Sequence, residues 1–160
     1  MLLLSKLLLL LLVANGTPVL ATRLLGERMA MPLDHNRPFF DGQPLFGVSK
    51  TLRGVLLAPL ATTVTAMLCG LLPEQGLVVG SFAMLGDLFS SFIKRRLKLP
   101  SGSKATLLDQ IPESLLPLFV YNLYWDLGWL SLLFLCAVFS IIEIFLSPLL
   151  FRWGIRSHPH

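Results

Sequence analysis

SLLPLFVYNLYWDLGWLSLLFLCAVFSIIEIFLSPLLF, residues Ser114 to Phe151, is the stretch that decides the fold class of this chain. Its 38 residues include only two charged side chains, Asp126 and Glu143. One continuous helix of this length would measure about 57 Å, nearly twice the roughly 30 Å hydrocarbon core of a bilayer. The stretch therefore predicts two membrane-spanning helices joined by a tight turn near Asp126–Trp129.

Three further apolar stretches precede it. Residues 2–25 are apolar apart from Lys6, Arg23 and a polar break at NGTP, residues 55–72 contain no charge, and residues 76–93 contain only Asp87. We therefore predict an all-α integral membrane protein with about five transmembrane helices, in a single polytopic domain covering residues 1–160. The expected spans are residues 2–22, 55–72, 76–93, 112–128 and 130–151. An alternative interpretation of the first stretch is a cleaved secretory signal, which would leave four spans.

The composition agrees with a membrane protein. Hydrophobic residues make up 54% of the chain and charged residues only 14%, whereas soluble domains carry about 25% charged residues. The net charge of +4 indicates topology and a preference for anionic lipids or ligands. No aromatic-rich basic surface accompanies it, so we expect no nucleic-acid partner. The two cysteines lie in apolar stretches and are expected to be unpaired thiols.

The basic residues predict the orientation of the chain. With the N-terminus outside and the C-terminus in the cytoplasm, twelve of the thirteen Lys and Arg residues face the cytoplasm. They lie in two cytoplasmic loops, residues 23–54 and 94–111, and after residue 151. This distribution follows the positive-inside rule. It predicts an integral protein of the cell (inner or plasma) membrane, with its functional loops on the cytoplasmic side.

Acids and cations concentrate where those two loops meet the membrane. Asp87, Ser91 and Lys94 are spaced to share one helix face, and a carboxylate inside a membrane needs a polar cavity, a cation or a partner. Carboxylates bind Mg²⁺, which usually also takes substrate phosphates, while Lys and Arg beside small residues suit phosphate oxygens. The pattern indicates phosphoryl or nucleotidyl transfer on a lipid.

Several sequence blocks resemble the CDP-archaeol synthase family, small relatives of the CDP-diacylglycerol synthases. The blocks are LFGVSKTLRG (45–54), GDLFSSFIKRR (86–96) and LLDQ (107–110), together with ANGTPVL (14–20) and PLDHNRPFFDGQPLFG (32–47). The resemblance implies an Mg²⁺-dependent cytidylyltransferase of phospholipid biosynthesis. Such an enzyme joins CTP to a phosphorylated glycerolipid, either an archaeal-type ether lipid phosphate or a phosphatidate-like lipid, and releases pyrophosphate and a CDP-lipid. The oligomeric state is left undefined.

The resemblance also implies roles for individual residues. The catalytic residues, which hold the phosphates of CTP and of the lipid, would be Lys50, Arg53, Lys94 and Arg95. The substrate-binding residues would be Asn15, Thr51, Ser91, Arg96 and Gln110. The metal ligands would be Asp87 and Asp109, with Glu113 as a further candidate.

One departure from the family pattern affects the metal ligands. The family commonly continues DQ with an apolar residue and a second Asp, whereas this chain reads DQIPES, with Pro112 in that place and Glu113 one residue later. The departure motivates an alternative function, a non-catalytic membrane lipid-binding or scaffold protein that retains the fold. A transporter or flippase is a third interpretation, which the absence of a detectable inverted repeat disfavours.

Overall fold

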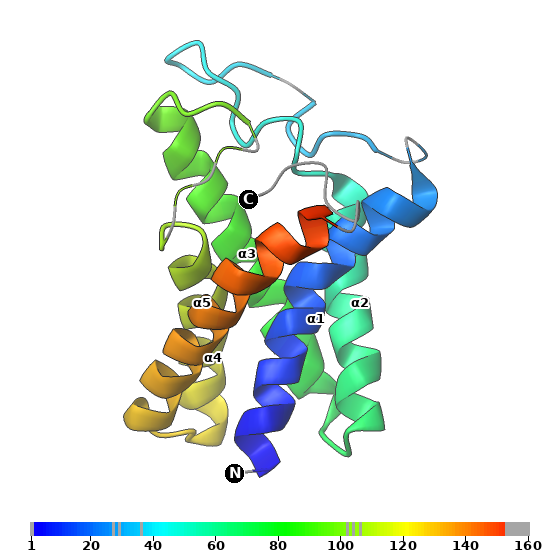
Figure 1. Ribbon diagram of the computed structural model, residues 1–160, viewed down its shortest axis with the longest axis vertical. Coiled ribbons are helices and arrows are strands. Elements are labelled where there is room, and N and C mark those ends of the chain that lie inside the picture. Colours follow the sequence, from blue (N-terminus) through cyan, green and yellow to red (C-terminus); the bar gives the residue numbers. More distant parts are fainter. Residues whose placement is uncertain are drawn as a thin grey trace.

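The fold is a bundle of five helices in the part of the chain that the computed structural model describes, residues 2–26, 28, 30–35, 37–101, 103, 105 and 107–152 (Figure 1). The helices are α1 (Leu2–Leu25), α2 (Leu52–Leu68), α3 (Pro73–Arg96), α4 (Gln110–Trp125) and α5 (Trp129–Arg152). Among these described residues, two isolated bridges are the β-type pairings, Pro32 with Thr51 and Pro38 with Pro44. The prediction of an all-helical membrane protein with five helices is confirmed, and its orientation stays a prediction.

The helices differ in length. α1, α3 and α5 have 24 residues each and are apolar enough to cross a membrane, while α2 is a shorter apolar helix of 17 residues and α4 has 16 residues. Their outward faces carry large apolar side chains, among them Leu68, Leu130 and Phe145, which are more than 70% exposed. Such faces suit lipid as the surrounding solvent.

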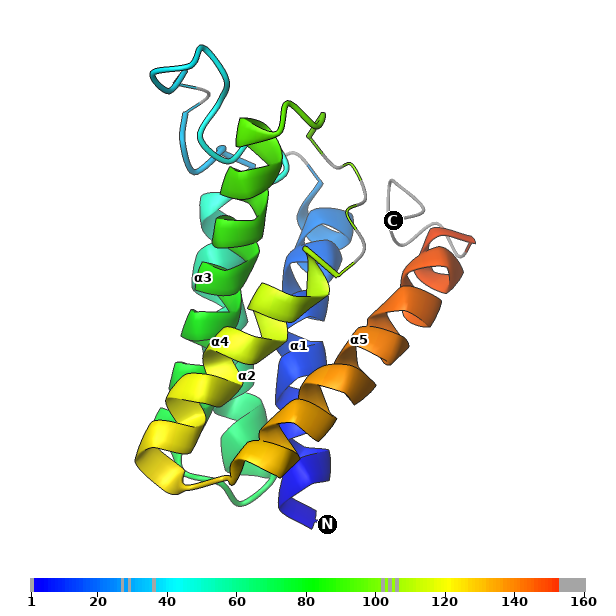
Figure 2. The same cartoon turned by 90° about the vertical axis from the view of Figure 1, so that its left-hand side faces the viewer.

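α3 is the central helix. It packs against α1, α2 and α4, while α5 packs against α4 and α1 (Figures 1 and 2). Half of the apolar window of α3 is buried, compared with about a third in α1 and α5. The buried core draws residues from every helix: Leu7, Leu10, Leu11, Ala66, Val79, Leu118, Tyr121, Leu132, Leu135 and Phe139.

Glycines let α3 approach its neighbours closely. A Cβ atom at Gly76 would lie 2.5 Å from the carbonyl oxygen of Thr62 on α2, and one at Gly80 would lie 2.7 Å from the Cα of Pro59. Both distances are too short for any side chain, so the two helices pack backbone against backbone. Membrane helices associate through small residues in this way, because lipid offers no hydrophobic drive for their contact.

The connections divide between the two ends of the bundle. The long segments that join α1 to α2 and α3 to α4 lie together at one end, and the short turns α2–α3 and α4–α5 lie at the other (Figure 1). The α4–α5 turn is the one expected near Asp126–Trp129. Asp126 ends α4 in the left-handed conformation, and the backbone N–H of Gly128 donates to Oδ1 of Asn122 at 2.7 Å.

The orientation can be tested by labelling single cysteines in a background that carries Cys69→Ala and Cys136→Ala. We expect Glu74→Cys, in the α2–α3 turn region, to react with a membrane-impermeant maleimide in intact cells. Val48→Cys, exposed in the α1–α2 segment, should react only after permeabilisation, because positive-inside topology puts that end in the cytoplasm. The reverse labelling pattern would contradict the predicted orientation.

Candidate functional site

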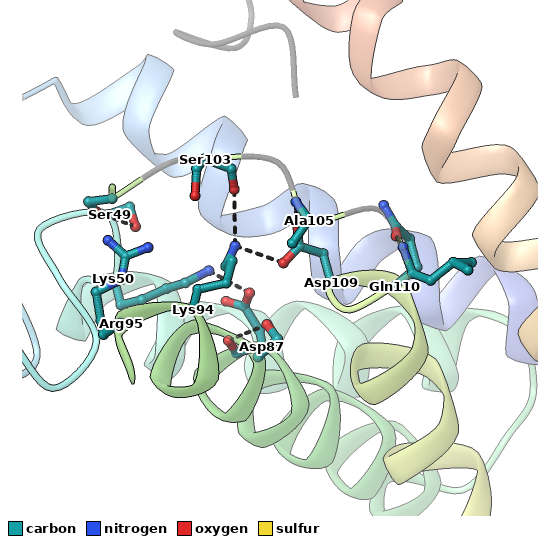
Figure 3. A network of polar contacts seen from close by, with 12 residues as sticks. Ser49, Lys50, Asp87, Lys94, Arg95, Ser103, Ala105, Asp109 and Gln110 are labelled. Atoms are coloured by element: carbon teal, nitrogen blue, oxygen red, sulfur yellow. Dashed lines mark hydrogen bonds and ion pairs between the residues drawn. The ribbon is translucent and has the colours of Figure 1, made fainter. Parts of the chain in front are cut away.

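Two ion pairs join the long segments to α3 at one end of the bundle (Figure 3). The ammonium of Lys50, just before α2, contacts Oδ1 of Asp87 on α3. The ammonium of Lys94, on the same helix, lies 2.7 Å from Oδ1 of Asp109, which precedes α4. Lys94 also donates to the carbonyl oxygen of Ser103 at 3.3 Å. The sequence predicted all four charged residues as site residues, and the fold brings them together.

Glu113 completes this group from the first turn of α4. Its carboxyl group shares a hydrogen bond with the carboxyl group of Asp87. Lys50 is within electrostatic reach of three acidic groups, those of Asp87, Glu113 and Asp109. We call these five residues the acid–lysine cluster: Lys50, Asp87, Lys94, Asp109 and Glu113. Its three carboxyl groups outnumber its two ammonium groups.

Lys50 is a fixed positive charge in this cluster. Burial by itself would lower the pKa of Lys50, but the attraction and hydrogen bond of Asp87, with the nearby charges of Glu113 and Asp109, outweigh burial and raise the pKa above its usual 10.5. The ammonium is therefore fully protonated at neutral pH. The stability that it contributes is complete below pH 10.5 and is lost only as the pH rises through the raised pKa. Lys50 suits binding of anions and is unsuited to act as a base.

Arg95 lies at the edge of the cluster. It is buried, its Nη2 donates to the carbonyl oxygen of Pro100 at 2.9 Å, and it is within electrostatic reach of Asp109. The two segments also meet directly beside it, where the hydroxyl of Ser101 lies 3.2 Å from that of Ser49. Figure 3 shows Ser49, Lys50 and Arg95 on the same side of the cluster.

Arg53 lies outside the cluster and holds the end of α1. Its guanidinium donates to the carbonyl oxygens of Gly26, at 2.7 Å, and of Arg28, and to the hydroxyl of Thr22 at 3.3 Å. These carbonyls follow the last turn of α1, where backbone oxygens lack helical partners. The described contacts of Arg53 are thus structural, and its predicted role in phosphate binding stays a prediction.

Arg96 also binds protein rather than lying free. Its guanidinium pairs with Asp41 at 2.9 Å, donates to the carbonyl oxygen of Pro44 at 2.6 Å, and lies over the rings of Phe39 and Phe92. It therefore fastens the α1–α2 segment to the end of α3. Asp34 stabilises the same segment by accepting from the backbone N–H groups at positions 46 and 47 at 2.8 and 3.0 Å.

The other predicted substrate-binding residues make local contacts. Thr51 caps α2 by accepting from the N–H of Gly54 at 3.4 Å, and Gln110 accepts from the N–H of Leu107 at 2.7 Å. Asn15 donates to the carbonyl oxygen of Leu11 one turn earlier in α1 at 3.1 Å. Ser91 is buried on α3 one turn beyond Asp87. Of these four, Thr51 and Gln110 directly follow the cluster residues Lys50 and Asp109 along the chain.

The cluster offers donors of the kind that Mg²⁺ takes. Among the described residues, no group of three or more His, Cys, Asp or Glu side chains is arranged to hold a metal ion by itself. Mg²⁺ is usually held by one or two carboxylates plus substrate phosphates, and not by an all-protein cage. The touching carboxyl groups of Asp87 and Glu113 fit that requirement.

Apolar helices with a cluster of acids and lysines at one end of the bundle characterise a membrane protein with a charged site. The chain belongs to the CDP-archaeol synthase family: the CarS-like family model, CDP-archaeol synthase, matches residues 1–156. The predicted resemblance is thereby confirmed, and membership makes the chain a nucleotidyltransferase of the CTP-dependent cytidylyltransferase kind.

Individual relatives cover nearly the whole chain. A CDP-archaeol synthase of Pyrobaculum islandicum is 35% identical over 88% of this chain and 82% of the relative. One of Pyrobaculum calidifontis is 34% identical, covering 92% and 90%, and one of Sulfolobus acidocaldarius is 31% identical, covering 92% and 91%. A solved intramembrane enzyme for archaeal membrane lipids biosynthesis has a TM-score of 0.66 and 25% identity, covering 84% of this chain and 89% of that one.

The Lys50–Asp87 pair can be tested by a double-mutant cycle. Lys50→Met should lower the free energy of unfolding by up to about 3 kcal/mol, because it leaves two adjacent carboxyl groups without their nearest cation. Adding Asp87→Asn should restore part of that loss. Equilibrium unfolding in mixed micelles measures both, with Lys6→Met, near the other end of the bundle, as control. Equal losses in the single and double variants would contradict the pairing.

The anchoring role of Arg96 predicts a local effect. Arg96→Ala should speed hydrogen exchange in residues 38–46 by at least about tenfold, since a charged hydrogen bond contributes about 1.5–3 kcal/mol. Arg96→Lys should give a smaller but clear increase in exchange rate, because lysine keeps the positive charge and lacks the planar guanidinium group that donates to two acceptors at once. Exchange mass spectrometry measures this, with exposed Lys98→Ala as control. Unchanged exchange together with a raised KM for CTP would instead assign Arg96 to substrate binding.

Proposed function

We propose that the chain transfers a cytidylyl group from CTP to the phosphate of an archaeal-type ether lipid, releasing pyrophosphate and forming a CDP-lipid. The observation that carries this proposal is the acid–lysine cluster. The α1–α2 segment, α3, the α3–α4 segment and α4 all contribute charged side chains to it. Family membership supports the same reaction. In this proposal the cluster faces the cytoplasm, where water-soluble CTP meets a lipid that stays in the membrane.

The reaction needs positioning and positive charge more than it needs a base. An oxygen of the lipid phosphate forms a bond to the α-phosphorus of CTP, and the bond from that phosphorus to the oxygen bridging the β-phosphate breaks. The electron pair leaves with pyrophosphate. Because the attacking oxygen is already anionic, no proton has to be removed. The remaining barrier comes from repulsion between the two polyanionic substrates and from negative charge that develops on the leaving group. Fixed cations lower both contributions.

The lysines and carboxylates of the cluster divide this task. Lys50 and Lys94, with Arg95 beside them, would supply the cations that bind phosphate oxygens. Asp87 and Glu113 would hold Mg²⁺, with Asp109 beside them. When bound, Mg²⁺ would neutralise phosphate charge and stabilise the departing pyrophosphate. Lys50 pairs with Asp87 and Lys94 pairs with Asp109, so an anionic substrate would compete with these two carboxylates for the ammonium groups.

The proposal is tested with purified protein in nanodiscs, CTP, Mg²⁺ and a panel of ether and ester lipid phosphates. We expect pyrophosphate release that depends on CTP and on the ether lipid phosphate. Asp87→Asn should lower the rate by about 10²–10³-fold, the size of effect that follows loss of one charge-stabilising group. Asp126→Asn is the matched control, because Asp126 lies in the α4–α5 turn in a left-handed conformation that Asn tolerates.

Failure of every lipid phosphate to support release in a folded protein would overturn this function. The alternative, a non-catalytic lipid-binding or scaffold protein, rests on Pro112 in the DQIPES sequence. The contact between Glu113 and Asp87 favours the enzyme, because the shifted acid still reaches the cluster. Lipid binding that is independent of CTP, Mg²⁺ and Asp109 would favour the alternative.

A further inference from the structure

α3 and α4 make a tight backbone contact beside the acid pair. A Cβ atom at Gly86 would lie 2.1 Å from the carbonyl oxygen and 2.5 Å from the carbonyl carbon of Pro112, and 2.9 Å from the Cα of Glu113. All three atoms belong to the backbone of α4, so no side-chain rotation relieves the contact. The two helices touch here without any side chain between them.

The sequence positions of this contact connect it to the chemistry. Gly86 directly precedes Asp87 on α3, and Pro112 directly precedes Glu113 on α4. The backbone contact and the carboxyl contact therefore involve consecutive residues on both helices. Any change in the spacing of the helices at Gly86 is passed to the two carboxyl groups with almost no intervening structure.

We propose that Gly86 is a positioning residue, whose missing side chain sets the distance between the carboxyl groups of Asp87 and Glu113. The inference rests on the proposed function, in which these two groups hold the metal ion. Pro112, the residue that breaks the family's acidic pattern, then supplies the backbone surface against which Gly86 packs. The altered sequence still has an acid here, Glu113, and Gly86 determines where that acid lies relative to Asp87.

A methyl group at Gly86 has a defined geometric effect. The carbonyl of Pro112 would have to withdraw from 2.1 Å to at least 3.4 Å, an ordinary van der Waals contact. Glu113 moves with it, so the carboxyl groups separate. Mg²⁺ demands ligands at about 2.0–2.1 Å in near-ideal geometry, whereas Ca²⁺ accepts about 2.3–2.6 Å in flexible geometry. Separation of the carboxyl groups should therefore weaken the binding of Mg²⁺ more than the binding of Ca²⁺.

Gly86→Ala tests this inference, with Gly76→Ala as its matched control. Gly76 lies on the same helix in an equally tight backbone contact, but against α2 and away from the acids. The readout is the shift of the thermal unfolding midpoint on adding CTP with MgCl₂ or with CaCl₂. Both variants should unfold at lower temperature without ligand. The Gly86→Ala variant should then need on the order of 10²-fold more Mg²⁺ to give the same shift of the unfolding midpoint. The shift that CaCl₂ gives should be mostly kept.

Gly76→Ala should keep the parent protein's response to both ions. Equal Mg²⁺ requirements in the two glycine variants would overturn the inference. If Gly86→Ala does not fold, Glu113→Asp withdraws the carboxylate by one methylene and leaves the helix contact unchanged. It should show the same selective loss of Mg²⁺, and a normal Mg²⁺ response would overturn the inference. A parent protein that CTP and Mg²⁺ never stabilise would instead count against the proposed function.

Discussion

The ion pair between Lys50 and Asp87 is the contact on which the functional end of this molecule depends. A carboxylate within a bundle of apolar helices is unstable without a partner, and the partner of Asp87 comes from the segment before α2. That segment must therefore fold back over the end of α3. Asp34 and Arg96 hold it in that position, and Lys50 then meets not one acid but three.

Lysine and arginine have separate tasks around this pair. Arg53 and Arg96 donate mainly to backbone carbonyls, although Arg96 also pairs with Asp41, and both hold chain segments in place, which suits the rigid fork of the guanidinium group. Lys50 and Lys94 instead pair with carboxylates as compact charges on flexible stems. Apolar residues of similar size would stabilise a buried site at least as well. A cluster of this kind is thus better explained by chemistry than by folding.

Hydropathy and charge were sufficient to predict the helices, because each apolar stretch is bounded by polar residues and lipid permits little besides helices. Asp87 and Lys94 were singled out by their spacing at a membrane boundary, and the family resemblance added Lys50 and Asp109; their roles in catalysis stay predictions. The contacts of Arg53 and Arg96 with backbone were not predictable, because a basic residue at a helix end looks the same whether it binds a carbonyl or a phosphate. The importance of Gly86 was hidden too, since its partner Pro112 is distant along the chain and only the packing of α3 against α4 brings them together.

The unequal lengths of α3 and α4 determine how deep the cluster lies. Asp87 is nine residues before the end of α3, about 13 Å along the helix, and Gly86 beside it packs against the first turn of the shorter α4. Figure 2 shows α4 beginning well short of the loop end of α3. Withdrawing a lipid chain from a bilayer costs about 0.8 kcal/mol for each methylene exposed. Under the proposed function, a lipid phosphate bound at the start of α4 would leave its chains in hydrocarbon. The short fourth helix would then let CTP reach the lipid without the lipid being withdrawn from the bilayer.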